Sequence, residues 1–317
     1  MAGVLQGRRP TTGDVAGEQR ASKATVLIVI VSYNSEDHLE RCLDSINTQL
    51  AVPTVVVIDN ASTDRSHEIA RHHPGVDLAI RNAVNTGFSA AVNQAARLAE
   101  CDKVLLLNPD VVLAPHTIDA LLDLAAQEPG SGIQGGRCLN AEGHLDPTSV
   151  LGKPSFWHAF AFAIALAEFR YLNRLDPDAL GGWQRDGTRP VDILTGAVLL
   201  IDRSLWNRLN GFDERYYLYW EDVDLCMRAR QLGYRPHFTD RAVYHHVGGA
   251  SSGNPTERMI RILRGKVNIY RDYVPVGGLA MLRMGVALRG LIEWLRRKET
   301  RFWRDCWTRR GEWLPAE

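Results

Sequence analysis

The stretch KVLLLNPDVVL, residues 103–113, decides the fold class. Its first five residues form an almost unbroken apolar run, which is typical of a strand buried on both faces of a parallel sheet. Pro109 cannot donate a hydrogen bond to a neighbouring strand, so the strand ends there and we expect Asp110 at its carboxyl edge. In open α/β sheets that edge is where ligands bind. Asp110 is therefore a candidate ligand for a metal-bound diphosphate, and the alternative is an ordinary turn aspartate.

Three earlier apolar runs, at 25–31, 55–58 and 77–80, alternate with amphipathic segments. This βαβαβ pattern predicts parallel strands joined by right-handed crossovers. Because the carboxyl ends of parallel strands share one edge, polar residues that follow the strands should form one rim. The rim residues are Ser32, Tyr33, Asp59, Asn60, Asn108 and Asp110.

The nucleotide-sized rim lacks the common nucleotide motifs. Neither GxxxxGK[ST] nor GxGxxG occurs, which argues against a P-loop and against a dinucleotide fingerprint. Gly87, between Asn85 and a predicted helix over 89–99, could let a ligand approach the backbone amides.

The second half of the chain is less regular. We expect an edge strand over 133–138, a buried strand after Thr195 and Gly196, and a short strand over 242–244 that leads into two histidines. Glu221, Asp222 and Asp224 open a predicted helix, where acids are favoured by the helix dipole. Residues 155–172 are apolar almost all round, which fits either a buried helix or a helix lying in a membrane interface.

Charge is distributed unevenly along the 317 residues. The net charge is zero, yet residues 256–310 hold fourteen Lys and Arg against five Asp and Glu. This excess points to an anionic partner, either membrane phospholipid or nucleic acid. Within it, a helix over 278–298 is predicted to carry one apolar face. The face consists of Ala280, Met281, Met284, Leu288, Leu291, Ile292, Trp294 and Leu295.

A basic amphipathic helix with Trp294 at its margin fits an anionic leaflet, and the alternative is a helix docked on its own domain. No stretch of eighteen uncharged apolar residues occurs, so we expect no spanning helix. The five cysteines are odd in number and lack a CxxC, which is typical of reduced thiols in a cytosolic protein. Residues 1–24 are polar and predict a disordered leader.

Eight motifs occur in the order found in one known family. They are VSYN at 31–34, IDNAS at 58–62, NTGFSAAVN at 85–93, NPD at 108–110, TGA at 195–197, GFDERY at 211–216, WEDVDL at 220–225 and HHVGGASS at 245–252. In these motifs the sequence resembles family 2 glycosyltransferases of the GT-A fold, in their bacterial rhamnosyltransferase-like branch. The resemblance implies an α/β, Rossmann-like, mostly parallel sheet flanked by helices, with a C-terminal amphipathic helical extension.

The resemblance also implies a domain plan. Residues 25–255 would form the GT-A domain, with a nucleotide-binding half at 25–130 and an acceptor half at 131–255. Residues 256–317 lie beyond the resemblance, and their charge and periodicity predict a basic, helical, membrane-associating tail.

Site roles follow from the same resemblance. The nucleotide-sugar side would consist of Ser32, Tyr33, Asp59, Asn85, Gly87, Asn108 and Asp110. The acceptor side would consist of Thr195, Gly196 and Glu221, with Asp222 as the catalytic base. Asp110 and His246 would hold a divalent cation, and His245 is the competing choice for the imidazole ligand.

One departure from the family's pattern concerns the metal. The commoner DxD motif is replaced by Asn108-Pro109-Asp110, so one carboxylate is missing. The cation would then be held largely by the diphosphate, as expected for Mg²⁺ or Mn²⁺. We also expect the neighbouring acids Glu221 and Asp224 to raise the pKa of Asp222 through like-charge repulsion.

The resemblance predicts an inverting nucleotide-sugar-dependent hexosyltransferase. The predicted reaction moves L-rhamnose from dTDP-rhamnose to a polyprenyl-diphosphate-linked saccharide in cell-wall or surface polysaccharide synthesis. The enzyme would be cytoplasmic and peripheral on the inner face of the cell membrane. The alternatives are a transferase for a UDP- or GDP-linked hexose and a catalytically silent nucleotide-sugar-binding scaffold.

Two other classes fit the residues less well. A sugar nucleotidyltransferase is disfavoured because no Gly-rich loop follows Val31. Nucleic-acid binding by the basic segment is disfavoured because no interleaved aromatic residues or nucleic-acid-binding motif accompany it. The sequence makes no prediction of oligomeric state.

Overall fold

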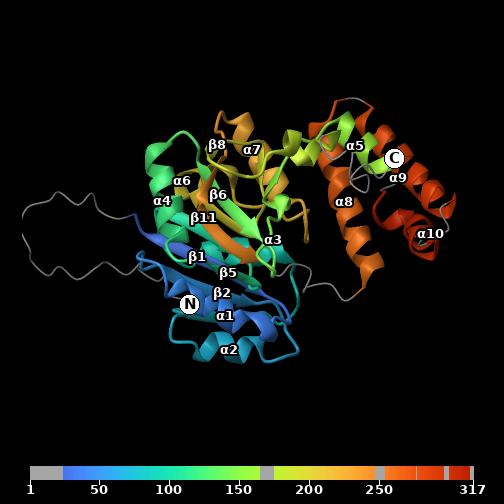
Figure 1. The fold of residues 1–317 in the computed structure, drawn as a ribbon. Helices are drawn as coiled ribbons and strands as arrows, with labels where there is room; N and C mark the ends of the chain where they lie inside the picture. Colours follow the sequence, from blue (N-terminus) through green and yellow to red (C-terminus); the bar gives the residue numbers. More distant parts are fainter. Residues whose placement is uncertain (1–23, 165–174, 247–253, 276, 296–299, 315–317) are drawn as a thin grey trace, which may run out of the picture.

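The computed structural model describes residues 24–164, 175–246, 254–275, 277–295 and 300–314. In these ranges a sheet of nine strands is covered by helices on both faces, and a group of C-terminal helices lies at one side of it (Figure 1). The predicted leader therefore lies outside the described residues, apart from Ala24.

The first half of the chain has the predicted alternation of strands and helices. Its elements are β1 (Val26–Ser32), α1 (Glu36–Ile46), β2 (Thr54–Asp59), α2 (Ser66–His72), β3 (Leu78–Arg81), α3 (Phe88–Ala96), β4 (Lys103–Leu107), β5 (Val111–Leu113) and α4 (Thr117–Gln127). β3, β2, β1 and β4 are parallel neighbours in that order. The predicted parallel arrangement is thus confirmed, and β4 has the predicted limits.

The second half adds strands that turn the sheet into a mixed one. Its elements are β6 (Ile133–Leu139), η1 (Pro147–Ser149), β7 (Val150–Leu151), α5 (Phe156–Ala163), η4 (Pro177–Gly182), β8 (Thr188–Pro190), β9 (Ile193–Leu194), β10 (Val198–Asp202), α6 (Arg203–Leu209), α7 (Glu221–Gln231) and β11 (His237–His246). β10 is antiparallel to both β4 and β6. The order of the main path is β3-β2-β1-β4-β10-β6-β11-β5, and β8 pairs with β11.

Two strand predictions were wrong in this half. β6 is an interior strand between β10 and β11, whereas we predicted an edge strand. β11 begins at His237, five residues before the predicted start at 242. In both cases the pairing partners come from distant parts of the chain, so the local pattern could not indicate them.

The hydrophobic core has two layers, one on each face of the sheet. Alternate residues of β1 point to opposite layers, as strand geometry requires. Helices α1, α2 and α4 cover one face, and α3, α6 and α7 cover the other. Because both faces are covered, the strands are apolar runs without alternation, which is what made them recognisable in the sequence.

The C-terminal helices are α8 (Pro255–Tyr273), α9 (Gly278–Leu295), α10 (Thr300–Thr308) and η5 (Arg310–Glu312). They pack with α5 at one side of the sheet (Figure 1). α9 approaches α5 closely at Gly285, where an added Cβ would lie 3.1 Å from the carbonyl oxygen of Ala159. The predicted helix over 155–172 is seen as α5, and residues 165–174 lie outside the described ranges.

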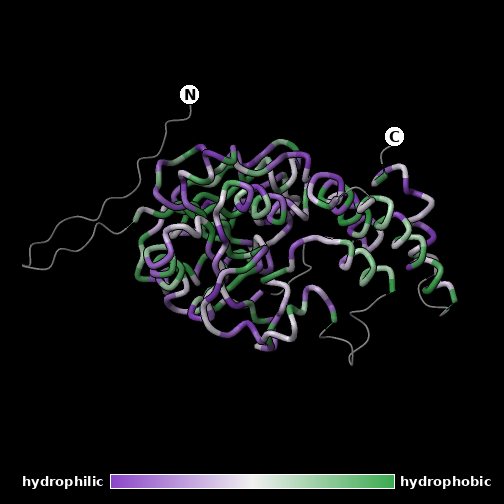
Figure 2. The backbone as a smooth tube through the Cα atoms, turned by 90° about the horizontal axis from the view of Figure 1, so that it is seen from above, coloured by the Kyte–Doolittle hydropathy of each residue, from purple (hydrophilic) through white to green (hydrophobic). Residues whose placement is uncertain are grey.

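Figure 2 shows that these helices carry many hydrophobic residues. Among the described residues, none of the helices has both the length and the hydrophobicity that crossing a bilayer requires.

Candidate active site

One corner of the site is formed where β11 runs antiparallel to β5. This pairing sets His246 opposite Val111, the residue after Asp110. His246 Nε2 lies 3.2 Å from Asp110 Oδ1, so the two predicted metal ligands lie side by side. The competing histidine, His245, instead directs Nδ1 to the carbonyl oxygen of Asn140, at 3.4 Å.

Two further side chains reach the same corner. Cys138, Asp146 and His246 offer potential ligand atoms that lie within 4.8 Å of one another. A hairpin brings Asp146 there, because its N–H donates to the carbonyl oxygen of Cys138 at 3.0 Å. Sequence reasoning missed Asp146, whose only local signal is its position before Pro147 at the start of η1.

The donor set at this corner fits a hard divalent cation. Two carboxylates and an imidazole are suitable for Mn²⁺, and the carboxylates for Mg²⁺. The Cys138 thiol is less suitable, because burial and the charge of Asp146 raise its pKa to about 12. Burial alone would raise the pKa of Asp110, but the hydrogen bond and charge of His246 outweigh it and hold the pKa below its usual value. The corner therefore carries a carboxylate that is ionised at neutral pH.

The ends of β1 and β2 form the predicted nucleotide rim. Ser32 pairs in register with Asp59, and both residues are fully buried. Asp59 Oδ2 accepts the N–H of Ser62 and lies 3.4 Å from Arg81 Nε. Among the described residues, Ser32 Oγ and Asp59 Oδ1 have no hydrogen-bond partner. Buried polar atoms without partners are costly, so their presence at this edge is consistent with a polar ligand.

The loop before α3 is held by hydrogen bonds of Asn85 within the loop and with two side chains outside it. Asn85 Oδ1 accepts hydrogen bonds from the Gly87 N–H, from Asn60 Nδ2 and from the Tyr217 hydroxyl. The N–H of Phe88 donates to the carbonyl oxygen of Tyr217 at 2.7 Å. An added Cβ at Gly87, whose φ is +87°, would lie 2.6 Å from the Tyr217 ring. The amides at this helix start are thus engaged within the protein, and Gly87 makes room for Tyr217; direct ligand contact by Asn85 and Gly87 stays a prediction.

Asp222 lies in the first turn of α7 and faces the predicted acceptor side. Its Oδ2 accepts the Gly196 N–H at 2.8 Å, and its Oδ1 accepts the Val223 N–H at 2.7 Å. The neighbouring Ala197 carbonyl accepts the N–H of Asn108 at 3.0 Å. A short hydrogen-bonded path therefore joins Asp222 to the segment that carries Asp110.

Burial raises the pKa of both Asp222 and Glu221. The two acids are not equivalent, because Asp222 accepts two backbone N–H groups whereas Glu221 Oε2 has no partner among the described residues. The charge of Asp222 raises the pKa of Glu221 further. We infer that Asp222 ionises first and that Glu221 keeps its proton to a higher pH than Asp222 does.

The expected cause of this shift needs a correction. We predicted repulsion from both Glu221 and Asp224, but burial is the largest cause for Asp222. Asp224 is engaged elsewhere, since Arg228 Nε lies 2.7 Å from Oδ2 and the Tyr273 hydroxyl 2.6 Å from Oδ1. Asp224 therefore anchors α7 to α8.

The backbone just before α7 is strained. Tyr219 and Trp220 have φ values of +74° and +76°, which bulky residues rarely adopt. Gly265 of α8 makes room for them, because an added Cβ there would lie 2.5 Å from Trp220 Cδ1. Strain of this kind is often found at functional sites, and here it directs the chain into Asp222.

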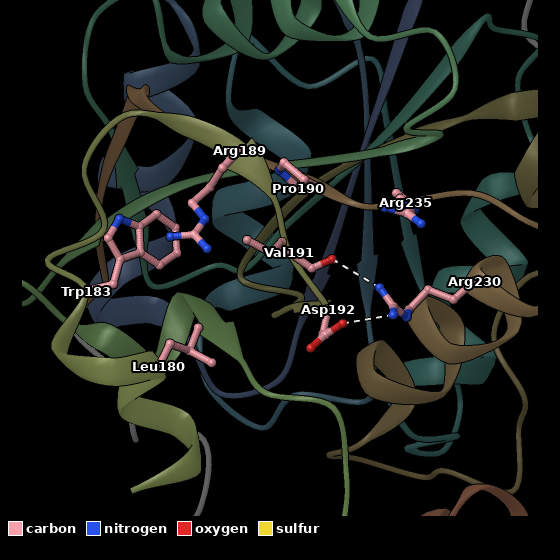
Figure 3. Close-up of a pocket in the computed structure, with 8 residues that line it drawn as sticks. All are labelled: Leu180, Trp183, Arg189, Pro190, Val191, Asp192, Arg230 and Arg235. Carbon is pink, nitrogen blue, oxygen red and sulfur yellow. Dashed lines mark hydrogen bonds and ion pairs between the residues drawn. The ribbon is translucent and has the colours of Figure 1, made fainter. Parts of the chain in front are cut away.

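An open hollow lies at the other end of α7. Figure 3 shows the residues that line it. The volume of the hollow is about 300 Å³. Arg230 there lies 2.9 Å from Asp192, and Arg189 lies over the Trp183 ring at 4.7 Å from its centroid. Arg230 is eight residues after Asp222, about 12 Å along the helix axis, so this hollow is separate from the candidate base.

Known proteins identify the family. The model of glycosyl transferase family 2 matches residues 27–148. The chain is 32% identical over 259 residues to the N-acetylglucosaminyl-diphospho-decaprenol L-rhamnosyltransferase of Mycobacterium tuberculosis, covering 73% of this chain and 79% of the relative. The chain belongs to glycosyltransferase family 2. This family 2 glycosyltransferase is also 27% identical over 222 residues to the rhamnosyltransferase WbbL of Escherichia coli, covering 67% and 80% of the two chains.

Solved structures of other glycosyltransferases share the fold. The mannosyltransferase PcManGT of Pyrobaculum calidifontis, in complex with GDP-Man and Mn²⁺, superposes with a TM-score of 0.59 at 18% identity, covering 97% of this chain and 92% of that one. TarS 1–349 of S. aureus, in complex with UDP, gives 0.52 at 16% identity, covering 92% and 93%. The predicted GT-A fold is thereby confirmed, and the protein is a nucleotide-sugar-dependent glycosyltransferase.

Proposed function

We propose that the protein is an inverting rhamnosyltransferase. It transfers L-rhamnose from dTDP-rhamnose to a saccharide linked through a diphosphate to a polyprenyl lipid. The similarity to two rhamnosyltransferases supports the sugar, and the Mycobacterium relative acts on a decaprenyl-diphosphate-linked substrate, as its name states. The observation that carries the chemistry is the hydrogen-bonded path from Asp222 through Gly196, Ala197 and Asn108 to the Asp110 corner.

Asp222 acts as the general base in this proposal. An acceptor hydroxyl is a weak nucleophile, so a carboxylate must remove its proton as it attacks the anomeric carbon. Two N–H donors orient the Asp222 carboxylate and favour its ionised form, while burial raises its pKa toward neutrality. Glu221, whose pKa is raised both by burial and by the charge of Asp222, is the weaker acid of the pair. A single displacement from the face opposite the nucleotide inverts the anomeric configuration.

The donor diphosphate lies at the opposite corner. Asp110, Asp146 and His246 would hold Mg²⁺ or Mn²⁺, which supplies Lewis-acid stabilisation of the leaving diphosphate. Ser32 and Asp59 offer buried polar atoms to the nucleoside, and Tyr33, 39% exposed, offers a ring on which a base can stack. None of these contacts selects thymidine over uridine or guanosine, so the dTDP donor rests on the family resemblance of the sequence alone.

An outward apolar face supports attachment to the inner face of the cell membrane. α9 packs on α5 through Leu282, Gly285 and Val286, and its Arg289–Glu293 ion pair also points inward. The predicted apolar face is therefore turned outward. Its large exposed side chains are Met284, Leu288, Leu291, Trp294 and Leu295.

Charge complementarity supports an anionic bilayer as the occupant of this face. Arg258, Arg264, Arg304 and Arg310 are exposed on the neighbouring helices α8, α10 and η5. Aromatic and aliphatic side chains beside exposed arginines are the pattern of an interfacial helix. A lipid-linked acceptor would then be reached from the same surface.

Asp222→Asn tests the proposed reaction. With dTDP-rhamnose, a decaprenyl-diphospho-N-acetylglucosamine acceptor and Mn²⁺, wild type should release dTDP and form the rhamnosylated lipid. The variant should lose turnover by about 10²- to 10⁴-fold, because the base is gone, while its affinity for dTDP-rhamnose changes little. Asp192→Asn is the matched control and should keep full turnover, because Asp192 pairs with Arg230 at the far end of α7 from Asp222.

Each alternative predicts a different result. Equal turnover of Asp222→Asn and wild type would reject Asp222 as the base. Turnover with UDP- or GDP-hexoses in place of dTDP-rhamnose would assign the other donor class. Donor binding without any product would favour the silent scaffold.

A further inference from the structure

A cavity of about 310 Å³ lies beside the candidate base, between the sheet domain and the C-terminal helices. Trp220 and Val223, which flank the Glu221-Asp222 pair, form part of its wall. Leu151 and Gly152 form another part, and β7 pairs there with β9, which leads into Thr195 and Gly196. The cavity therefore borders both segments that form the proposed acceptor side.

Lys266 of α8 is the unusual group in this cavity. It is only 9% exposed, and Nζ lies 4.2 Å from the ring centroid of Phe162, 5.7 Å from that of Trp220 and 6.0 Å from that of Tyr270. In the described part of the chain, no atom accepts a hydrogen bond from Nζ. Burial lowers the pKa of Lys266 to about 8, so the ammonium form still predominates at neutral pH.

The acids near Lys266 are already engaged. Asp178 Oδ1 accepts the Gly152 N–H at 3.0 Å and lies 3.4 Å from His158 Nε2. Asp176 accepts the Asp178 N–H as the cap of η4. A buried cation that lacks a hydrogen-bonded anion is costly, and an anionic ligand with several oxygen atoms would offset that cost.

The walls of the cavity also belong to the helices with exposed apolar side chains. α5 contributes Phe162 to the cavity and exposes Phe156, Trp157 and Phe160. α10 contributes Trp303 and exposes Trp307. A ligand with an anionic group in the cavity and a hydrocarbon chain on the outer face would match both surfaces.

We propose that this cavity binds the diphosphate of the lipid-linked acceptor, with Lys266 as its cationic contact. The inference rests on the proposed function, and it names the part of the acceptor that this region recognises. Diphosphate oxygens would accept the three N–H groups of the ammonium, and the isoprenoid chain would leave along α5 and α9. The attached saccharide would then reach Asp222 from the side of Trp220.

Calorimetric titration of the full chain tests the proposal without any transfer reaction. The probes are farnesyl diphosphate, farnesol and inorganic pyrophosphate, with EDTA present so that no divalent cation contributes. Lys266→Met should weaken farnesyl diphosphate binding at least tenfold, and Lys266→Arg should keep it within about threefold. Farnesol binding should not depend on residue 266. Arg271→Met, at another exposed position on the same helix, is the matched control and should bind as wild type does.

Three results would overturn the proposal. Wild-type affinity of Lys266→Met for farnesyl diphosphate would remove the cationic contact. If Lys266→Met lost affinity for farnesol as much as for farnesyl diphosphate, Lys266 would have a packing role only. If Lys266→Met does not fold, the same comparison is made with Lys266→Gln, provided that its melting temperature equals that of wild type. Pyrophosphate binding as tight as farnesyl diphosphate would assign the site to a free diphosphate. Because no donor is present, these results do not depend on whether rhamnose is the transferred sugar.

Discussion

At the scale of single residues, the adjacent carboxyl groups of Glu221 and Asp222 have different environments and therefore different acidities. The backbone N–H groups of Gly196 and Val223 stabilise charge on Asp222, whereas Glu221 is 7% exposed and Oε2 lacks a partner among the described residues. A carboxyl buried in this way lowers the stability of the folded state once the solution pH favours ionisation.

Glu221→Gln should therefore stabilise the protein at high pH. The pKa of Glu221 is higher in the folded protein than its value of 4.5 in a model peptide. At pH values below 4.5, Glu221 is protonated in both the folded and the unfolded protein. As pH rises above it, the unfolded chain ionises first and wild type loses stability, whereas the Gln variant does not titrate. At pH 8 we expect the variant to melt about 2–4 °C higher than wild type, which corresponds to about 1 kcal/mol in the free energy of unfolding. At pH 4 we expect the two proteins to melt at the same temperature.

Thermal unfolding at the two pH values measures this difference. Glu142→Gln, at an exposed loop position, is the control and should show no pH-dependent gain. A Glu221→Gln variant that is less stable than wild type at pH 8 would contradict the inferred protonation state.

The residues of the site were predictable to the extent that they lie in short motifs. Asp110, Asp222 and His246 stand in such motifs, and the structure brings Asp110 and His246 into contact. Asp146 and Lys266 could not be found in this way. A hairpin brings Asp146 to its site and the packing of α8 brings Lys266 to its cavity, and no local pattern indicates either. The choice between His245 and His246 likewise depended on the register of β11 against β5.

At the scale of elements, the position of α7 depends on a close contact with α8. Gly265 sits inside α8 where Ala would normally favour the helix by about 1 kcal/mol. Here a Cβ would lie 2.5 Å from Trp220 Cδ1 and 3.0 Å from the carbonyl oxygen of Tyr219. Steric contact should outweigh helix propensity at this position, because the nearest atoms belong to a ring and to the backbone.

Gly265→Ala should therefore lower turnover by about tenfold to a hundredfold, because small displacements of catalytic groups are costly. Donor affinity should be preserved, since the nucleotide rim lies on other elements. Gly290→Ala in α9 is the control, because the nearest atom to its added Cβ is 4.0 Å away. Steady-state rates measure the effect on turnover, and dTDP-rhamnose titration measures the effect on donor affinity. Full turnover of Gly265→Ala would show that catalysis does not depend on the position of Trp220.

The elements themselves were partly predictable. β1 to β4 and α4 were confirmed because buried parallel strands and amphipathic helices have strong local patterns. α8 falls in the segment 256–317 that was predicted to be helical, but its own limits were not predicted, because the segment was read only as a basic tail. β6 was misassigned to an edge because the insertion of β10 beside it is set by long-range pairing.

At the scale of the whole molecule, the outward face of α9 should mediate vesicle binding. Leu291 is 50% and Trp294 62% exposed, so charged residues there will not disturb the core. We expect Leu291→Glu together with Trp294→Glu to reduce binding to phosphatidylglycerol vesicles at least tenfold, which is about 1.4 kcal/mol. Loss of apolar burial and repulsion of the new carboxylates both contribute.

Co-sedimentation with vesicles measures this binding. Val52→Glu, 73% exposed on the sheet domain, is the control and should bind as wild type does. Unchanged binding of the double variant would exclude α9 as the membrane contact. Point substitutions are preferable to removal of residues 276–317, because Trp313 is buried and Arg309 pairs with Glu257 of α8.

Tyr217 connects the two halves of the molecule, since its ring covers Gly87, its hydroxyl donates to Asn85 Oδ1, and Arg261 lies over its ring at 5.4 Å from the centroid. A nucleoside bound beside Asn85 would therefore lie close to the segment that carries Tyr217 and leads into Asp222. Kinetically, the two substrates should add in sequence to one ternary complex, with the donor entering first.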